Sequence, residues 1–126
     1  MEAVLQGKLI SEASYNEIFS PQVRIRSKIQ FGPGSLEETD KYDDINLSYG
    51  LGWGLLDTPH GPGAFKEGHG NGFQHYTILF PEAGKGIMML TNSDNGEGIF
   101  KELLELAIGD TYTPWEWENY IPYQER

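Results

Sequence analysis

Hydrophobic and polar positions form their clearest pattern in the middle of the chain. The segments His75–Phe80 and Gly86–Asn92 are rich in β-branched and apolar residues. Between them lies Pro81–Lys85, whose proline and glycine favour a turn. The pattern therefore predicts a β-hairpin over residues 75–92.

A second pair of strands is predicted upstream. Large residues alternate with glycine in Tyr49–Leu56, which suits a strand with one packed face and one face open to a neighbouring backbone. Two prolines and two glycines in Asp57–Ala64 predict a turn, after which Phe65–Gly70 returns as the partner strand. In Gln22–Asn46, apolar residues alternate with basic ones before an acidic stretch, and either a strand or an extended loop fits.

Helical patterns lie near both ends of the chain. Glu2–Leu5 has the composition of the end of a helix, and a second helix is predicted over residues 12–19 with Ser11 as its N-cap. Apolar residues recur at helical spacing from Ile99 to Ile108. We expect this last helix to lie across the sheet.

These elements predict an α+β fold with an antiparallel sheet of three to five strands and helices packed on one face. We expect the 126 residues to form a single domain, because one core can grow to this size. The aromatic C-terminal tail is expected to close the domain edge as a clasp, with an aromatic binding site as the alternative. The expected segments are a helical and loop region over 1–48, the sheet over 49–92, a helix over 93–110 and the tail over 111–126.

The charge balance limits the range of partners. Nineteen acidic and nine basic residues give a formal net charge of −10. The basic residues do not cluster beyond Arg24, Arg26 and Lys28, and phosphate binding needs a basic footprint, so nucleic acid is not an expected partner. We expect the acidity to serve solubility, and a role in cation binding is the alternative.

Cysteine is absent, which excludes disulfides, thiolate nucleophiles and cysteine-ligated zinc. No segment approaches the ~18 consecutive apolar residues that would cross a bilayer, so a membrane is not an expected partner. Residues 1–6 lack the charged and apolar regions of a signal peptide. A cytoplasmic location is the expectation for the chain as written, although cysteine usage leaves the compartment undetermined.

Several pieces of the chain follow one another in a familiar order and spacing. The pieces are Leu5–Val23, Tyr49–Trp53, Glu67–Phe73, Phe80–Pro81 and Gly86–Gly96. Together they resemble the C-terminal part of the β-lactamase-related serine hydrolases, which include class C β-lactamases, D-alanyl-D-alanine peptidases and family VIII-type esterases. The resemblance covers nearly the whole chain and implies a partial β-lactamase or transpeptidase-like fold.

The resemblance also implies a candidate cleft strand, which comprises His69, Gly70, Asn71 and Gly72. In the family, a Ser-x-x-Lys motif supplies the nucleophile, a Tyr-x-Asn motif supplies a general base, and a Lys-Thr-Gly or His-x-Gly strand lines the cleft. His69 matches the first position of that strand. The segment Phe65–Phe73 would then form the cleft edge, where backbone groups bind a substrate amide or help form the oxyanion hole. Asn71 departs from the family pattern, which has glycine at the third position.

The other two motifs have no counterpart. No serine is followed three residues later by lysine, no tyrosine is followed two residues later by asparagine, and a Gly-x-Ser-x-Gly elbow is absent. Acyl transfer needs an activated nucleophile beside a base, so no catalytic residue is assigned and we expect the chain alone to be inactive. Its start within a predicted helix fits a nucleophile and base that belong to polypeptide before Met1.

No metal or cofactor is predicted. His60, His69 and His75, with Glu67 nearby in sequence, lack the His-x-x-x-His spacing that puts two imidazoles on one helical face. Asp94–Gly98 resembles a Ca²⁺ loop only superficially, because it lacks alternating acidic ligands and a distal glutamate. We expect a turn that leads into the following helix.

Two functions are compatible with these observations. The preferred hypothesis is a truncated serine hydrolase scaffold that is inactive alone and acts as a small binding or assembly protein. The alternative is the C-terminal half of an active esterase, peptidase or β-lactamase, completed by another chain or by missing N-terminal sequence. Because the helices that cover the family's sheet are missing, we expect a homo-oligomer through the exposed sheet or helix face. A small-molecule ligand is the other expected partner.

Overall fold

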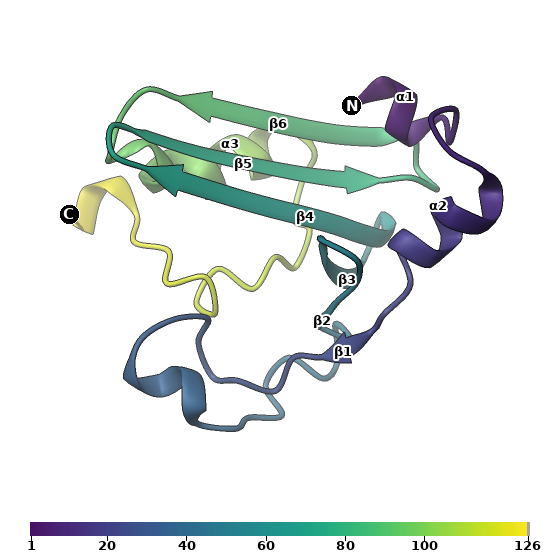
Figure 1. The fold of residues 1–126 in the computed structure, drawn as a ribbon. Helices are drawn as coiled ribbons and strands as arrows, with labels where there is room; N and C mark the ends of the chain where they lie inside the picture. The colour runs from purple at the N-terminus through teal and green to yellow at the C-terminus, as the bar shows by residue number, and fades with distance from the viewer. Residues whose placement is uncertain (126) are drawn as a thin grey trace.

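Six antiparallel strands, paired in chain order, form the centre of the computed structural model, which describes residues 1–125 (Figure 1). The predicted α+β class with an antiparallel sheet is confirmed. The sheet exceeds the predicted three to five strands because the predicted strand Tyr49–Leu56 is divided into β2 and β3, and β1 pairs with β2. The strands are β1 (Val23–Arg24), β2 (Ser48–Tyr49), β3 (Gly54–Thr58), β4 (Gly61–Gly70), β5 (Phe73–Phe80) and β6 (Lys85–Thr91).

The helices lie on both faces of the sheet, not on one face as predicted (Figure 1). The Phe100 ring of α3 packs on Tyr76, whereas a Cβ on Gly86 would lie 3.1 Å from the Met1 sulfur. Gly86 pairs with Leu79, which is three positions from Tyr76 and so faces the opposite side. Glycine at position 86 leaves room there for the N-terminal segment. The helices are α1 (Glu2–Leu5), α2 (Glu12–Ile18) and α3 (Phe100–Ala107), with 3-10 turns η1 (Pro33–Leu36), η2 (Gly96–Ile99) and η3 (Tyr123–Glu125).

The predicted strand Tyr49–Leu56 is divided in two by a bend at residues 50–53. Gly52 has a φ of +89°, a left-handed conformation that glycine adopts without steric strain. The Gly50 amide donates to the Trp53 carbonyl at 2.8 Å and closes the bend. The alternation of glycine and large residues therefore marks two short strands and not one.

The predicted turn Asp57–Ala64 is much shorter than expected. Thr58 pairs with Gly61, so only Pro59 and His60 lie between the strands. The Thr58 hydroxyl donates to the Gly61 carbonyl at 2.8 Å and accepts from the His60 amide at 3.0 Å. These side-chain bonds replace the longer loop that the prolines and glycines indicated.

The remaining predicted elements are confirmed with small shifts at their ends. β5 and β6 form the hairpin predicted for residues 75–92, and α3 is the helix predicted for residues 99–108. α2 begins after Ser11, whose Oγ accepts from the Ser14 amide at 3.2 Å. Of the segment Gln22–Asn46, only the two residues of β1 form a strand.

The core lies on the face that α3 covers. Phe65, Tyr76, Ile78 and Phe80 are at most 2 % exposed, and Leu104 from α3 is fully buried against this cluster. Side chains alternate between the two faces of a strand. The opposite face of the same strands is therefore separate from this core.

The C-terminal tail closes this core. Trp117 is 4 % exposed and lies edge-on to Phe65, with ring centroids 6.3 Å apart. Its indole nitrogen donates to Ser27 Oγ at 3.1 Å, and its carbonyl accepts from the Gln30 amide at 2.7 Å. Lys41 and Glu116 add an exposed ion pair. Burying an aromatic side chain of this size contributes roughly 4–6 kcal/mol of hydrophobic free energy, so Trp117 is the main attachment of the tail.

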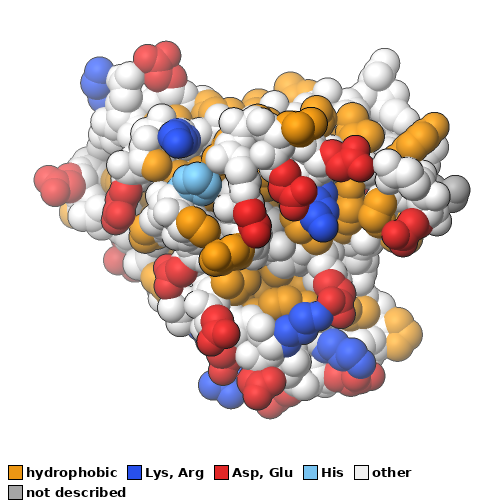
Figure 2. Space-filling view, turned by 180° about the vertical axis from the view of Figure 1, so that it is seen from behind, with side chains coloured by type: hydrophobic (Ala, Val, Ile, Leu, Met, Phe, Trp, Pro, Cys, Tyr) orange, Lys and Arg blue, Asp and Glu red, His pale blue; other side chains and the backbone are white. Residues whose placement is uncertain are grey.

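Acidic side chains are dispersed over the surface. Figure 2 shows them scattered among apolar and basic side chains on the face seen from behind. Such a distribution favours solubility over a focused cation site. Within residues 1–125, no helix is both long and apolar enough to cross a membrane.

Two strand glycines provide a matched test of core packing. Gly54 pairs with Phe65, and a Cβ there would lie 2.3 Å from the Phe65 ring, whereas a Cβ on Gly68 would meet nothing within 4 Å. Gly54→Ala is expected to lower the free energy of unfolding by roughly 1–3 kcal/mol, because the ring must leave its place in the core. Gly68→Ala should change it by less than about 0.5 kcal/mol. Urea denaturation of both variants checks this, and equal losses would contradict the packing described.

Candidate functional site

The four residues of the predicted cleft strand lie where β4 turns into β5. His69 and Gly70 end β4, and Asn71 and Gly72 form the two-residue turn. Gly72 has a φ of +84°, which this turn position requires and glycine provides. The strand thus ends three residues before the predicted limit at Phe73, because Phe73 pairs back onto Gly70. Asn71, the departure from the family pattern, belongs to the turn and not to the strand.

The loop after β6 holds this turn in place. Asp94 Oδ1 accepts from the Gly72 amide at 2.6 Å, and the Glu97 amide donates to Gln74 Oε1 at 2.6 Å. Both bonds join the hairpin end to the residues that lead into α3. The expectation of a helix-leading turn at Asp94–Gly98 is confirmed by η2, and Asp94 is a structural residue that the sequence reasoning did not identify.

The outer edge of β4 is unpaired near His69. β3 pairs with β4 only between residues 61 and 65, so within residues 1–125 no strand pairs with residues 66–70 on that side. Gly68 and His69 are exposed. An unpaired edge presents backbone N–H and C=O groups that an extended peptide can bind. This end of β4 therefore has the hydrogen-bonding groups that a cleft edge needs.

The His69 side chain lies on the core face, beside acidic groups. It alternates in phase with Phe65 and Glu67 and helps to line a small cavity of about 20 Å³. Glu97 and Glu118 line the same cavity. A space of this size holds about one water molecule, so the cavity has no room for a substrate.

The carboxyl groups around this cavity affect one another. Burial raises the pKa of Glu118 well above its ordinary value, and the charges of Glu67 and Glu97 raise it further. Burial also raises the pKa of Glu67, although the Gln30 side chain and His69 oppose this effect. Glu118 Oε1 has no hydrogen-bond partner within residues 1–125. Trp117 thus holds the tail on the core, whereas ionisation of its neighbour Glu118 opposes this packing.

No nucleophile–base pair accompanies His69. Apart from Ser48, the described serines have hydroxyl groups that bond to serine, glutamine, tryptophan or backbone groups, and none bonds to lysine or histidine. Ser48 Oγ is buried without any partner in this part of the chain. Between residues 1 and 125, no group of three His, Cys, Asp or Glu side chains is placed to hold a metal ion.

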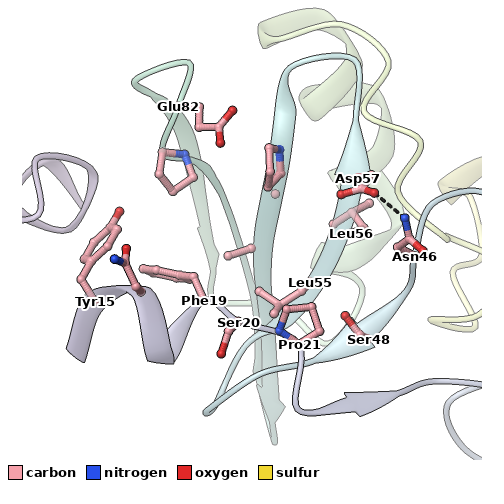
Figure 3. Close-up of a pocket in the computed structure, with 15 residues that line it drawn as sticks. Tyr15, Phe19, Ser20, Pro21, Asn46, Ser48, Leu55, Leu56, Asp57 and Glu82 are labelled. Carbon is pink, nitrogen blue, oxygen red and sulfur yellow. Dashed lines mark hydrogen bonds between the residues drawn. The ribbon is translucent and has the colours of Figure 1, made fainter. Parts of the chain in front are cut away.

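A larger cavity of about 430 Å³ lies on the opposite face, between α2 and strands β2–β4 (Figure 3). Its lining is mostly apolar. Sequence reasoning did not identify it, because its lining residues are far apart along the chain and no periodic pattern connects them. Tyr15, Phe19, Ser48, Leu55, Asp57 and Ala64 are among the residues that line it.

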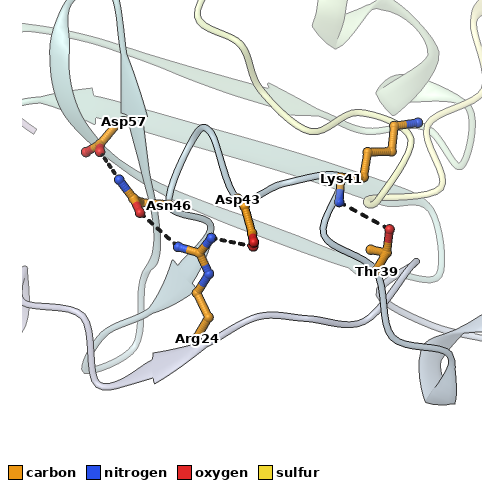
Figure 4. Close-up of polar contacts among 6 residues, drawn as sticks. All are labelled: Arg24, Thr39, Lys41, Asp43, Asn46 and Asp57. Carbon is orange, nitrogen blue, oxygen red and sulfur yellow. Dashed lines mark hydrogen bonds and ion pairs between the residues drawn. The ribbon is translucent and has the colours of Figure 1, made fainter.

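A chain of polar contacts leads outward from Asp57 and Asn46, which line this cavity (Figure 4). Asn46 Nδ2 donates to Asp57 Oδ2 at 2.5 Å, and Asn46 Oδ1 accepts from Arg24 at 3.0 Å. Arg24 also forms an ion pair with Asp43 at 2.7 Å. Asn46 therefore separates the guanidinium group from the Asp57 carboxylate.

Comparison with known proteins identifies no relative: no protein-family model, curated protein or solved structure matches the chain. The resemblance to β-lactamase-related hydrolases therefore depends on the residues themselves. The structure itself contributes two observations on a possible site: the open edge of β4 near His69 and the two cavities on opposite faces of the sheet.

The buried carboxyl group of Glu118 predicts a specific pH dependence. Its folded-state pKa is raised above the unfolded value of about 4.3. Its contribution to stability is therefore complete below that pH and is lost as pH rises through the folded-state pKa. Glu118→Gln cannot ionise, so its melting temperature should exceed that of the unmodified protein at pH 8 and approach it near pH 4.5. One kcal/mol corresponds to roughly 3–6 °C in a chain of this size.

Glu105→Gln is the matched control. Glu105 is exposed on α3, and its replacement by glutamine removes one negative charge from the protein, as Glu118→Gln does. Its melting temperature should track that of the unmodified protein at both pH values. Thermal unfolding followed by circular dichroism measures all three proteins. A Glu118→Gln effect that is equal at both pH values would rule out a titrating buried carboxyl.

Proposed function

We propose that this chain is a serine hydrolase-like scaffold that lacks the catalytic motifs and acts as a binding or assembly protein. The observation that carries the proposal is a bare apolar strip on the sheet face opposite α3. Phe73, Met88 and Leu90 are 41 %, 48 % and 66 % exposed. Met88 pairs with Thr77 and Leu90 with His75, so these side chains are neighbours on one face.

The strip is the part of this face that the N-terminal helices leave uncovered. Met1 lies over Gly86 at one end of the sheet, whereas Phe73 and Leu90 lie toward the other end. Adjacent exposed apolar side chains favour association, because burying them removes hydrocarbon from water. A second copy that brings the same strip would cover it in a two-fold symmetric contact.

The outer side of α3 is the second candidate surface for assembly. Leu103 is 39 % exposed and Leu106 is 85 % exposed. Net charge of −10 opposes the approach of two copies at low ionic strength. Either contact would therefore depend on apolar burial and would be strengthened by added salt.

The alternative function is the C-terminal half of an active serine hydrolase. The open edge at residues 66–70 favours it, because an extended substrate can bind there through its amide groups. In this alternative, the nucleophile and base come from other polypeptide, and His69 lies at the edge of the completed cleft. The two functions differ in whether the chain turns over a substrate when polypeptide that carries the nucleophile and base is supplied.

Hydrolysis assays test the proposed inactivity. Purified chain is expected to hydrolyse p-nitrophenyl acetate and a chromogenic cephalosporin no faster than buffer, because no activated nucleophile is present. Release of nitrophenolate and colour change are followed at several protein concentrations. A rate that scales with protein concentration would overturn the proposed inactivity of the chain, and a lower rate in His69→Ala would place His69 in the active site.

Charge substitutions identify the assembly surface. Leu90→Glu should convert an oligomer to monomer if the sheet strip is the contact, since a carboxylate would be buried at the interface. Leu106→Glu makes the same change on α3 and serves as the matched variant. Both side chains are exposed, so neither change should affect folding. Sedimentation velocity measures the effect, and a monomeric unmodified chain at micromolar concentration would refute assembly.

A further inference from the structure

The cavity under α2 contains two hydroxyl groups without partners. Ser48 is 2 % exposed, and its Oγ has no hydrogen bond among residues 1–125. Tyr15 Oη is also buried and unpaired there. Buried polar groups are almost always hydrogen-bonded, because losing water without a replacement costs free energy. Both hydroxyl groups therefore have unused capacity for hydrogen bonds to water or to a bound molecule.

Both hydroxyl groups are placed on the walls of this cavity. Ser48 pairs with Leu55, and Leu55 pairs with Ala64, so these three side chains share the floor. Tyr15 and Phe19 form the side that α2 provides (Figure 3). The Tyr15 hydroxyl is protonated at neutral pH, as tyrosine ordinarily is, and burial raises its pKa further. The ligand must bring an apolar body and at least one polar group.

The charge at the rim selects among such ligands. The carboxylates of Asp57 and Glu82 border the cavity, and no lysine or arginine among residues 1–125 lines it. Arg24 approaches this side only through Asn46 and is paired with Asp43. An anion would meet two uncompensated carboxylates here, whereas a cation would be attracted.

We propose that this cavity binds a small amphiphilic amine. Its apolar body lies over Leu55 and Ala64, its polar groups bond to Ser48 or Tyr15, and its ammonium group lies near Asp57 and Glu82. The cavity volume of about 430 Å³ falls within the ~300–1,000 Å³ of small-molecule sites. This inference rests on the proposed binding function and names its ligand class.

Three matched probes test the ligand class. Naphthylethylamine, naphthylethanol and naphthylpropionate share one aromatic body and differ in charge. By isothermal titration calorimetry at low salt, the amine should bind about tenfold more tightly than the alcohol, and the carboxylate should bind most weakly. The preference for the amine should shrink as salt rises. Equal binding of amine and carboxylate, or no binding of any probe, would overturn the proposal.

Three variants locate the site. Ser48→Ala removes an unpaired hydroxyl, so its melting temperature should not fall, while affinity for the amine should drop about fivefold if Ser48 contacts the ligand. Ala64→Leu fills the floor and should abolish binding. Glu82→Gln should reduce the preference for the amine over the alcohol, and Glu105→Gln, which removes a charge far along the chain on α3, should not. Binding that none of the three cavity variants alters would refute this site.

The outcomes also separate this inference from the proposed function. Failure of the probes in a chain that is inactive and oligomeric overturns the ligand class and leaves the assembly function intact. Amine binding that responds to Ser48→Ala supports the inference, whether or not the chain is oligomeric. Ester hydrolysis would overturn the proposed function, and the probe affinities would still decide the ligand class.

Discussion

The alternation of side chains on β4 and β5 is the constraint on which the rest of the structure depends. One set of positions, represented by Phe65, Tyr76 and Ile78, is covered by α3 and the tail. The other set meets α1 and α2 at one end and solvent at the other. Because the period is two residues, a slip of one position would exchange these sets and destroy the core. The register of the β4–β5 pair therefore fixes which face is packed and which is available.

The tail completes the packed face under opposing forces. Trp117 contributes apolar burial and two hydrogen bonds, whereas Glu118 brings an ionisable group near Glu67 and Glu97. For the tail to stay in place when Glu118 is ionised, the aromatic contact must exceed this electrostatic cost. The cost nevertheless makes this end of the molecule sensitive to the protonation of Glu118, and the open edge of β4 near His69 lies beside it.

Local patterns account for what the sequence predicted correctly. The hairpin of β5 and β6 and the amphipathic helix α3 follow from the period of neighbouring residues. The pairing of β1 with β2 joins segments more than twenty residues apart and could not be read from either one. The contact between Trp117 and Phe65 could not be predicted for the same reason, because no periodicity in the sequence links the tail to β4. Side-chain bonds from Thr58 shortened a turn whose composition indicated a longer loop.

The candidate site could be predicted only in part, because local patterns can be read from the sequence and contacts between distant segments cannot. A motif in one segment placed His69 on an expected strand Phe65–Phe73, which ends at Gly70. The face to which His69 points depends on register, and two of its acidic neighbours, Glu97 and Glu118, come from η2 and the C-terminal tail. The cavity under α2 has no motif at all, since α2, β2 and β3 each contribute only a few residues.

The separation of the two faces also separates two kinds of chemistry. His69 lies on the core face at the end of β4, whereas Ser48 and the larger cavity lie on the other face near its start. Changes at the end of β4 therefore need not disturb the cavity. A chain with this arrangement presents a packed core, an exposed apolar strip and a mostly apolar cavity at separate places on one sheet.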